Sequence, residues 1–193
     1  MPRIFIILVS LAAAVLGGCQ TTAPVDRAQL GKIVLTGSNY ADETVNWEVP
    51  PRDSVFTGAY HSKTPIVVPG AQTITTGEVL SLIASSPDAV LIDVLGGGAH
   101  ATIPTALWLN GAGLGENLND RVQVRMAERL NTLTAGDRRK PLVFFCLSAQ
   151  CWLSYNASLR AVALGYTNVK WYRGGQTSWM AAGLPTETSI ESR

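Results

Sequence analysis

The sequence has 193 residues, of which 47% are hydrophobic, and its 15 basic and 14 acidic side chains leave a formal net charge of +1. This length is enough for one domain with a real core and an extension. A nearly neutral chain lacks the basic footprint of a nucleic-acid-binding protein, so we expect no nucleic-acid partner.

Residues 1–18 have the profile of a signal peptide. Arg3 precedes an apolar run that is too short to span a bilayer comfortably as a mature helix. The run ends in Leu16-Gly17-Gly18-Cys19, which resembles the lipobox of bacterial lipoproteins. The resemblance implies cleavage before Cys19 and a lipid anchor on it, and Gln20 favours the periplasmic side of the outer membrane. An ordinary secretory signal and a retained membrane anchor are the alternatives.

Residues 19–70 are predicted to form a tether and an extension rich in Pro and Gly. Residues 21–29 are small and polar, which is typical of a flexible tether, and residues 32–35 suggest a short strand. The many Pro and Gly residues that follow predict an irregular segment on the domain surface. Aromatic residues indicate that this segment docks: Trp47, Phe56 and Tyr60. His61 and Lys63 could face the active site, but solvated side chains are the simpler interpretation.

The folded domain is predicted to span residues 71–188, leaving 189–193 as a tail. Thr75 or Thr76 can cap a helix whose apolar residues follow at helical spacing: Val79, Leu80, Leu82 and Ile83. Residues 89–94 then predict a buried strand that contains Asp93 near its end. Ligands collect at the carboxyl ends of parallel strands, so this position places Asp93 near a possible site.

Two further helices and two further strands complete the predicted domain. Residues 118–133 predict an amphipathic helix with an apolar face: Val122, Val124, Met126, Leu130 and Leu133. Residues 142–145 are a short apolar run of the kind that a buried parallel strand requires, and helical spacing begins after Cys151. Gly165 ends that helix, and residues 167–172 alternate as a strand does. The order predicts an α/β fold, with a parallel sheet flanked by helices on both faces.

Cys146 directly follows a buried strand, and a short loop leads from it into a helix. Backbone N–H groups in a tight loop and the positive end of a helix dipole stabilise a thiolate, a persulfide or a bound oxyanion. Cysteine reactivity follows thiolate content, so Cys146 is the candidate nucleophile, and we expect its sulfur to be presented at the edge of the sheet. A buried structural cysteine is the alternative.

This segment resembles the second half of a rhodanese domain. The likeness rests on Cys146-Leu-Ser-Ala-Gln-Cys151, on the helix after it, on Asn168-Val169 and on Gly174-Gly175 before Trp179. In that family a catalytic cysteine opens a six-residue loop that wraps around the transferred sulfur. The resemblance implies that Cys146 is catalytic and that the following residues cradle the substrate: Leu147, Ser148, Ala149, Gln150, Cys151 and Trp152.

Two other residues match positions of the rhodanese pattern. Asp93 lies in Leu91-Ile-Asp93-Val94, where a rhodanese Asp helps to tie together the loops around the active site, and His100 precedes Ile103-Pro104. The resemblance implies supporting roles, because sulfur transfer by a stabilised thiolate needs no histidine base. Leu95 stands where many relatives have Arg. The sequence predicts neither a cofactor nor a metal site, and the glycine-rich stretch at 110–116 lacks the Lys and the context of a phosphate-binding loop.

The loop itself departs from a generic thiosulfate sulfurtransferase. It contains no Arg or Lys, so attraction of an anionic donor would depend on backbone amides and the helix end, and we expect Arg160 to face elsewhere. The run from Cys151-Trp152 to Asn156-Ala157 resembles that of CXXCW-motif rhodanese-like proteins associated with pyrroloquinoline-quinone (PQQ)-dependent alcohol catabolism. That resemblance implies a periplasmic quinoprotein system as a partner.

Three functions remain open from the sequence. The first is a sulfurtransferase or persulfide carrier that uses Cys146, with a small sulfur donor and a thiol acceptor as partners. The second is a thiol-disulfide redox module, in which Cys146 and Cys151 cycle between dithiol and disulfide if their Cα atoms lie within about 7 Å. The third is a non-catalytic accessory protein of PQQ-dependent alcohol oxidation.

Overall fold

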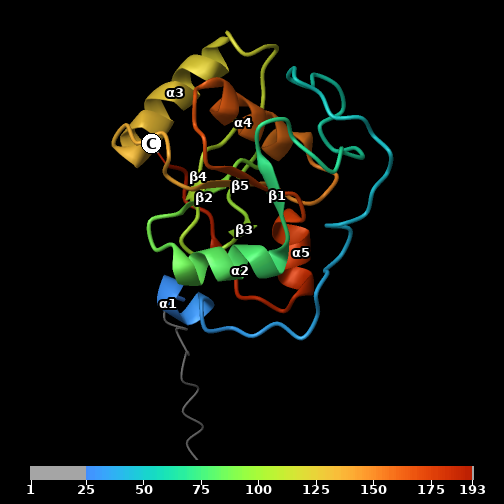
Figure 1. Ribbon diagram of the computed structural model, residues 1–193, viewed down its shortest axis with the longest axis vertical. Coiled ribbons are helices and arrows are strands. Elements are labelled where there is room, and N and C mark those ends of the chain that lie inside the picture. The colour runs from blue at the N-terminus through green and yellow to red at the C-terminus, as the bar shows by residue number, and fades with distance from the viewer. Residues whose placement is uncertain (1–24, 193) are drawn as a thin grey trace, which may run out of the picture.

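The computed structural model describes residues 25–192, and a five-stranded parallel sheet forms its centre (Figure 1). The strand order is β1-β6-β5-β2-β4, and every neighbouring pair is parallel. The bounds are Gln72–Ile74 for β1, Val90–Asp93 for β2, Leu107–Trp108 for β4, Leu142–Phe145 for β5 and Val169–Tyr172 for β6. The predicted parallel α/β fold is confirmed. A small antiparallel pair, β3 (Ala101–Thr102) with β7 (Glu187–Thr188), lies outside this sheet.

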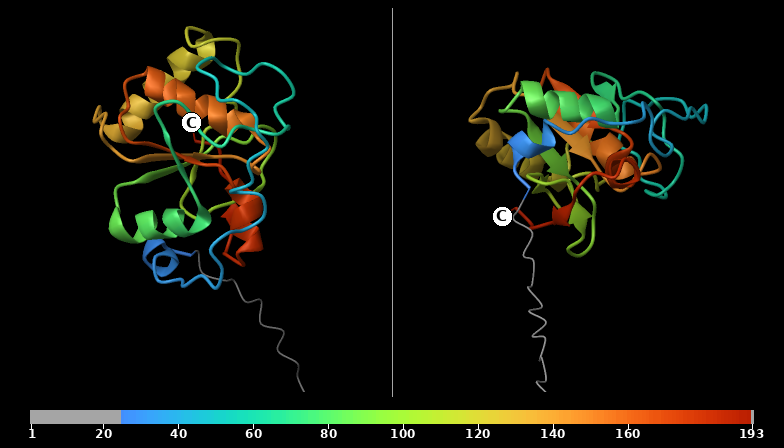
Figure 2. Two further views of the ribbon diagram at one scale, coloured as in Figure 1. Left: turned by 45° about the vertical axis from the view of Figure 1, so that its right-hand side comes forward. Right: turned by 90° about the horizontal axis from the view of Figure 1, so that it is seen from below.

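Helices cover both faces of the sheet, as the alternation of elements predicts (Figures 1 and 2). One face carries α1 (Arg27–Leu30), α2 (Thr76–Ser85) and α5 (Gly175–Ala181), and the other carries α3 (Arg121–Thr134) and α4 (Trp152–Ala163). The central strand β5 shows why two layers form. Leu142 and Phe144 pack in the cluster beneath α3 and α4, whereas Val143 and Phe145 pack in the cluster beneath α2, because successive strand side chains point to opposite faces.

The helix signals in the sequence are largely confirmed, with one error in α3. Thr75 caps α2 through a capping box with Glu78. The helix α3 begins after Asp120, which accepts a hydrogen bond from the Gln123 amide, rather than at residue 118. Its buried face consists of Gln123, Met126, Leu130 and Thr134. Val124 is 57% exposed, so its assignment to the apolar face is wrong: the position faces solvent, and polar Gln123 faces the core.

The tether and the extension are more ordered than the sequence suggests. Residues 27–30 form α1, capped by Asp26, and Leu30 is fully buried in the core beside α2, so the tether prediction is wrong there. Residues 32–35 form no strand, because they pack on the domain without a neighbouring strand to pair with. The extension, residues 31–70, docks as predicted, and Phe56 stacks on Trp152 with ring centroids 4.1 Å apart. His61 is exposed, as expected.

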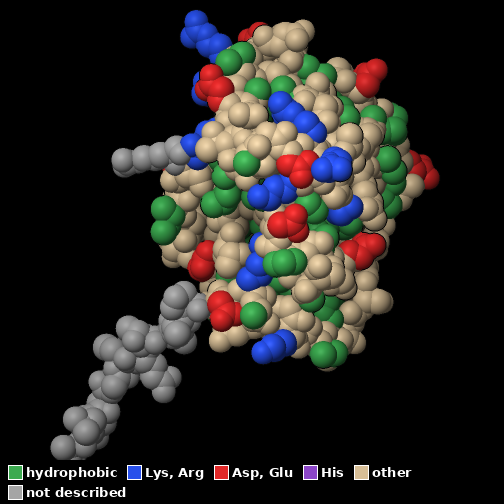
Figure 3. Space-filling view, turned by 60° about the vertical axis from the view of Figure 1, so that its left-hand side comes forward, with side chains coloured by type: hydrophobic (Ala, Val, Ile, Leu, Met, Phe, Trp, Pro, Cys, Tyr) green, Lys and Arg blue, Asp and Glu red, His purple; other side chains and the backbone are tan. Residues whose placement is uncertain are grey.

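The signal peptide and Cys19 lie outside the described residues. Within residues 25–192, no helix has the length and apolar character needed to cross a membrane. On the face drawn in Figure 3, basic and acidic side chains are intermixed and do not gather into a patch of one sign.

Candidate active site

The structure joins Cys146 and Cys151 in a disulfide, with their Cα atoms 6.2 Å apart. Cys146 follows β5, and Cys151 is the N-cap residue of α4, so the bond closes the loop between strand and helix. The two side chains are 1% and 0% exposed and belong to the core cluster under α3 and α4. In this oxidised form the Cys146 sulfur is enclosed in the core with Cys151, so the expectation of a sulfur presented at the edge of the sheet is wrong for the disulfide.

The backbone of residues 146–151, called the cysteine loop below, is fixed through its carbonyl groups. The Cys146 oxygen accepts from the Gln176 amide (3.0 Å), and the Leu147 oxygen accepts from the amide (2.8 Å) and hydroxyl (2.9 Å) of Thr177. Gly175 permits this approach, because its φ is +57° and a Cβ atom there would collide with the Cys146 carbonyl. Sequence reasoning noted Gly174-Gly175 but missed Gln176, which anchors the loop from α5.

Fewer of the backbone amide groups of the cysteine loop than of its carbonyl groups are hydrogen-bonded to other parts of the protein. The N–H groups of Leu147, Ser148 and Ala149 make no hydrogen bond to any residue between 25 and 192. They are therefore available to negative charge. The Trp152 N–H, at the start of α4, donates instead to the Tyr60 carbonyl of the extension (2.8 Å). The predicted contribution of the helix end is thus reduced, because the extension occupies its first donor.

A buried polar network supports the cysteine loop from the side of β2. The Asp93 carboxylate is fully buried and accepts from His100 Nε2 (2.9 Å), Thr102 Oγ1 (2.6 Å), Gln176 Nε2 (2.8 Å) and the Leu95 amide (2.9 Å). Asp93 thereby connects the end of β2, the His100 segment and α5. His100 also contacts the Gly98 carbonyl through Nδ1 (2.9 Å). Both residues occupy supporting positions, and Asp93 reaches the cysteine loop through Gln176.

Arg173 is a buried cation beside the cysteine loop that sequence reasoning missed. It follows β6 and is fully buried, and its guanidinium donates to the Thr64 hydroxyl and to the carbonyls of Asp42, Glu43 and Thr64. The Thr64 hydroxyl in turn donates to the Ala149 carbonyl (2.6 Å). Burial lowers the pKa of Arg173, and nearby Asp42 partly offsets this. The sequence did offer a signal for this residue, because Arg173 directly follows the last residue of β6, an inner strand.

A polar pocket of about 200 Å³ lies on the outer side of the cysteine loop. Its walls come from the extension, the loop and the start of α5: Ala41, Asp42, Ser148, Ala149, Gln150, Gly174, Thr177 and Ser178. Trp152 does not contribute, because its indole stacks on Phe56 and donates to the Ser62 hydroxyl (3.1 Å). Of the six residues predicted to cradle a substrate, Ser148, Ala149 and Gln150 line this pocket, whereas Trp152 anchors the extension.

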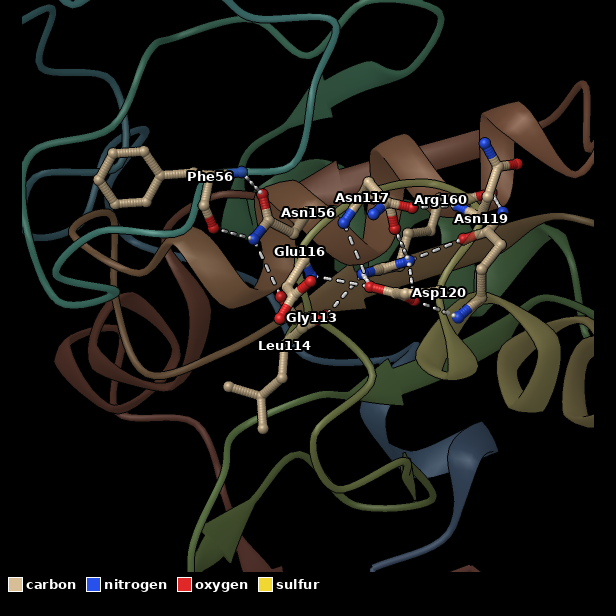
Figure 4. A network of polar contacts seen from close by, with 10 residues as sticks. Phe56, Gly113, Leu114, Glu116, Asn117, Asn119, Asp120, Asn156 and Arg160 are labelled. Carbon is tan, nitrogen blue, oxygen red and sulfur yellow. Dashed lines mark hydrogen bonds and ion pairs between the residues drawn. The ribbon is translucent and has the colours of Figure 1, made fainter.

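Arg160 contacts the glycine-rich stretch and Asp120 (Figure 4) and makes no hydrogen bond to the cysteine loop, as expected. Its guanidinium is fully buried and binds the Asp120 carboxylate (2.8 and 3.1 Å), together with the carbonyls of Leu114 and Asn117. One helical turn earlier, Asn156 exchanges hydrogen bonds with the backbone of Phe56 and donates to the Gly113 carbonyl. The glycine-rich stretch is thus a structural loop held by α4. Within residues 25–192, no group of acidic, His and Cys side chains is arranged to hold a metal ion.

Fold and site together define a class: a parallel α/β domain that carries a cysteine pair between its central strand and the following helix. The family model of the rhodanese-like domain matches residues 75–182, which is more than half of the chain. The chain therefore belongs to the rhodanese-like domain family. No curated protein sequence matches it significantly.

Several solved structures are similar to this chain. A full-length protein from Lactobacillus plantarum is 20% identical over 60% of this chain and 87% of its own, with a TM-score of 0.45. A thiosulfate sulfurtransferase from Pseudomonas aeruginosa is 21% identical over 64% of this chain, with a TM-score of 0.46, and the match spans 21% of its length. A polysulfide-sulfur transferase homodimer from Wolinella succinogenes is 20% identical over 62% of this chain and 80% of its own, with a TM-score of 0.43.

Proposed function

We propose that the protein is a sulfurtransferase-type enzyme in which reduced Cys146 accepts a sulfane sulfur and carries it as a persulfide. One observation carries this proposal: in a rhodanese-like domain, Cys146 opens a six-residue loop in which the amides of Leu147, Ser148 and Ala149 have no protein partner. These donors suit the negative charge of a thiolate or a persulfide. The neighbouring polar pocket is of a size for a small sulfur donor.

The chemical step conserves atoms and charge. The Cys146 thiolate attacks the outer sulfur of a donor such as thiosulfate, the S–S bond of the donor breaks, and sulfite leaves with the bonding pair. The buried Arg173 guanidinium adds positive potential beside the cysteine loop, and Asp42, which lines the pocket, partly offsets it. Arg173 partly replaces the basic residue that the loop lacks.

A second candidate is a thiol-disulfide redox module, and the Cys146–Cys151 bond favours it. In this function the pair accepts or donates two electrons, and no sulfur is carried. The enclosed position of both sulfur atoms suits a stable disulfide that forms within the folded chain.

Intact-mass spectrometry of the reduced protein after exposure to thiosulfate or polysulfide tests the proposal. We expect a gain of one sulfur atom, which the Cys146→Ser variant loses. The same variant also reports any reaction at Cys19. If the wild type instead becomes two hydrogens lighter, and no variant gains sulfur at any time, the result supports the redox module.

We further propose that the protein is exported and anchored by lipid on Cys19 at the periplasmic side of the outer membrane. The lipobox-like Leu16-Gly17-Gly18-Cys19 supports this proposal. The Cys151-Trp152 signature supports a role beside a PQQ-dependent quinoprotein system, and an accessory role there without catalysis is the remaining alternative. Metabolic labelling with a fatty acid, compared between the wild type and Cys19→Ala, tests the anchor.

A further inference from the structure

We infer that Cys151 is the residue that resolves the persulfide, so that the protein releases the carried sulfur as sulfide and becomes the Cys146–Cys151 disulfide. This inference rests on the proposed persulfide on Cys146. It assigns a catalytic role to the second cysteine and changes the product, because the sulfur leaves reduced and is not handed on to an acceptor thiol.

The geometry directs the attack of Cys151 to the inner sulfur of the persulfide. That inner sulfur is the Sγ atom of Cys146, which is the atom that Cys151 Sγ contacts in the disulfide. A 6.2 Å Cα separation lies within the range that disulfides require, so the bond forms on the backbone as it stands. The step balances: the Cys151 thiolate bonds to Cys146 Sγ, the S–S bond of the protonated persulfide (Cys146–S–SH) breaks, and the outer sulfur keeps its proton and leaves as hydrosulfide with the bonding pair.

The position of Cys151 suits a nucleophile. It is the N-cap of α4, a helix of 12 residues, and its side chain makes no capping hydrogen bond. The start of a helix favours negative charge, although the Trp152 N–H of α4 is taken by the Tyr60 carbonyl. Hydrosulfide is a stable anion at neutral pH and therefore a good leaving group.

Burial favours this neighbour over an external acceptor. Cys146 is 1% exposed, and the extension closes the same side through the Thr64 to Ala149 hydrogen bond and the Tyr60 to Trp152 hydrogen bond. An acceptor thiol from solution must open these contacts, whereas Cys151 is already in place and reacts intramolecularly. Each turnover then needs a dithiol reductant, which reduces the disulfide and becomes a disulfide itself.

The test compares wild type, Cys151→Ser and Cys146→Ser after reduction and removal of the reductant. Each protein receives one equivalent of thiosulfate without added thiol, since this donor releases sulfite and supplies no sulfide of its own, and intact mass and released sulfide are followed together. We expect the wild type to gain one sulfur transiently, to release about one sulfide per chain and to end two hydrogens lighter than its reduced form. Cys151→Ser should keep the added sulfur and release less than a tenth as much sulfide, and Cys146→Ser should do neither.

The outcomes separate the two proposals. A wild type that keeps its added sulfur as stably as Cys151→Ser overturns the resolving role and leaves the persulfide intact. Failure of both proteins to take up sulfur overturns the proposed function, and the inference falls with it. Cys151→Ala provides a second variant if the serine disturbs folding, and the order of species in the wild-type time course tests the step without any substitution.

Discussion

The substitution Asp93→Asn should destabilise the fold and loosen the cysteine loop, because four donors converge on one buried carboxylate. Oδ2 accepts from His100, Thr102 and Gln176, and Oδ1 accepts from the Leu95 amide. An asparagine amide replaces one acceptor atom by an NH₂ group. If that group takes the Oδ2 position it faces three donors, and in the flipped orientation it faces the Leu95 N–H.

Even the better orientation leaves a buried donor without a partner and removes the negative charge opposite His100. One unsatisfied buried donor costs roughly 1–3 kcal/mol, and hydrogen bonds to a charged group are worth about 1.5–3 kcal/mol each. We therefore expect the free energy of unfolding to fall by about 3 kcal/mol, which lowers the Tm by roughly 6–12 °C in a domain of this size. Thr102→Val is the matched control, since it deletes one hydroxyl donor to the same carboxylate and should cost about 1.5 kcal/mol, at the lower end of that range.

Urea unfolding of the wild type, Asp93→Asn and Thr102→Val measures these differences. The functional readout is the rate at which a small dithiol reduces the Cys146–Cys151 bond. This rate should rise severalfold in Asp93→Asn, because Gln176 bridges Asp93 and the Cys146 carbonyl. An Asp93→Asn variant as stable as the Thr102 control, or with an unchanged reduction rate, would refute the reasoning.

Two further predictions concern the buried Asp120–Arg160 pair and Thr64, which contacts the cysteine loop. Asp120→Asn leaves the buried Arg160 cation unpaired and should cost about 3–5 kcal/mol, whereas Asp137→Asn in an exposed pair should leave the free energy of unfolding nearly unchanged, as measured by urea unfolding. Burial raises the Asp120 pKa, but hydrogen bonds from Arg160 and backbone amides outweigh it and lower the pKa. The stability from Asp120 is therefore present above about pH 4 and lost as pH falls towards its folded pKa, and acid unfolding of Asp120→Asn should lack this loss. Thr64→Ala frees the Ala149 carbonyl and should speed disulfide reduction severalfold at unchanged secondary structure by circular dichroism, and a rate equal to wild type would contradict a closing role for the extension.

The local part of the fold could be predicted because short-range patterns determine it. The apolar run Leu142–Phe145 needs only its own sequence to indicate a buried strand, and Thr75 with Glu78 forms the capping box that begins α2. The rhodanese-like order of elements then places Cys146 and Asp93 at the same edge of the sheet. The prediction of the strand and the prediction of the capping box each depend on residues within a few positions of one another.

The contacts that close the site could not be predicted, because they join distant segments. Thr64 and Ala149 lie 85 positions apart, and Phe56 and Asn156 lie 100 positions apart. The hydrophobic periodicity of a sequence does not indicate which distant segments contact each other. The helix α1 is too short for periodicity to reveal, although Asp26 followed three residues later by Gln29 was a usable capping signal.

The enclosed cysteine pair and the polar pocket together constrain what can react at this site. The pocket of about 200 Å³ has room for a small sulfur donor, and the extension holds the other side of the cysteine loop through Thr64 and Tyr60. A small sulfur donor can approach the reduced loop from the pocket, but a protein acceptor must first displace the extension. If Cys146 carries sulfur as we propose, the nearest nucleophile is Cys151, and the contacts of the extension that should slow reduction of the disulfide should also favour sulfide release over transfer.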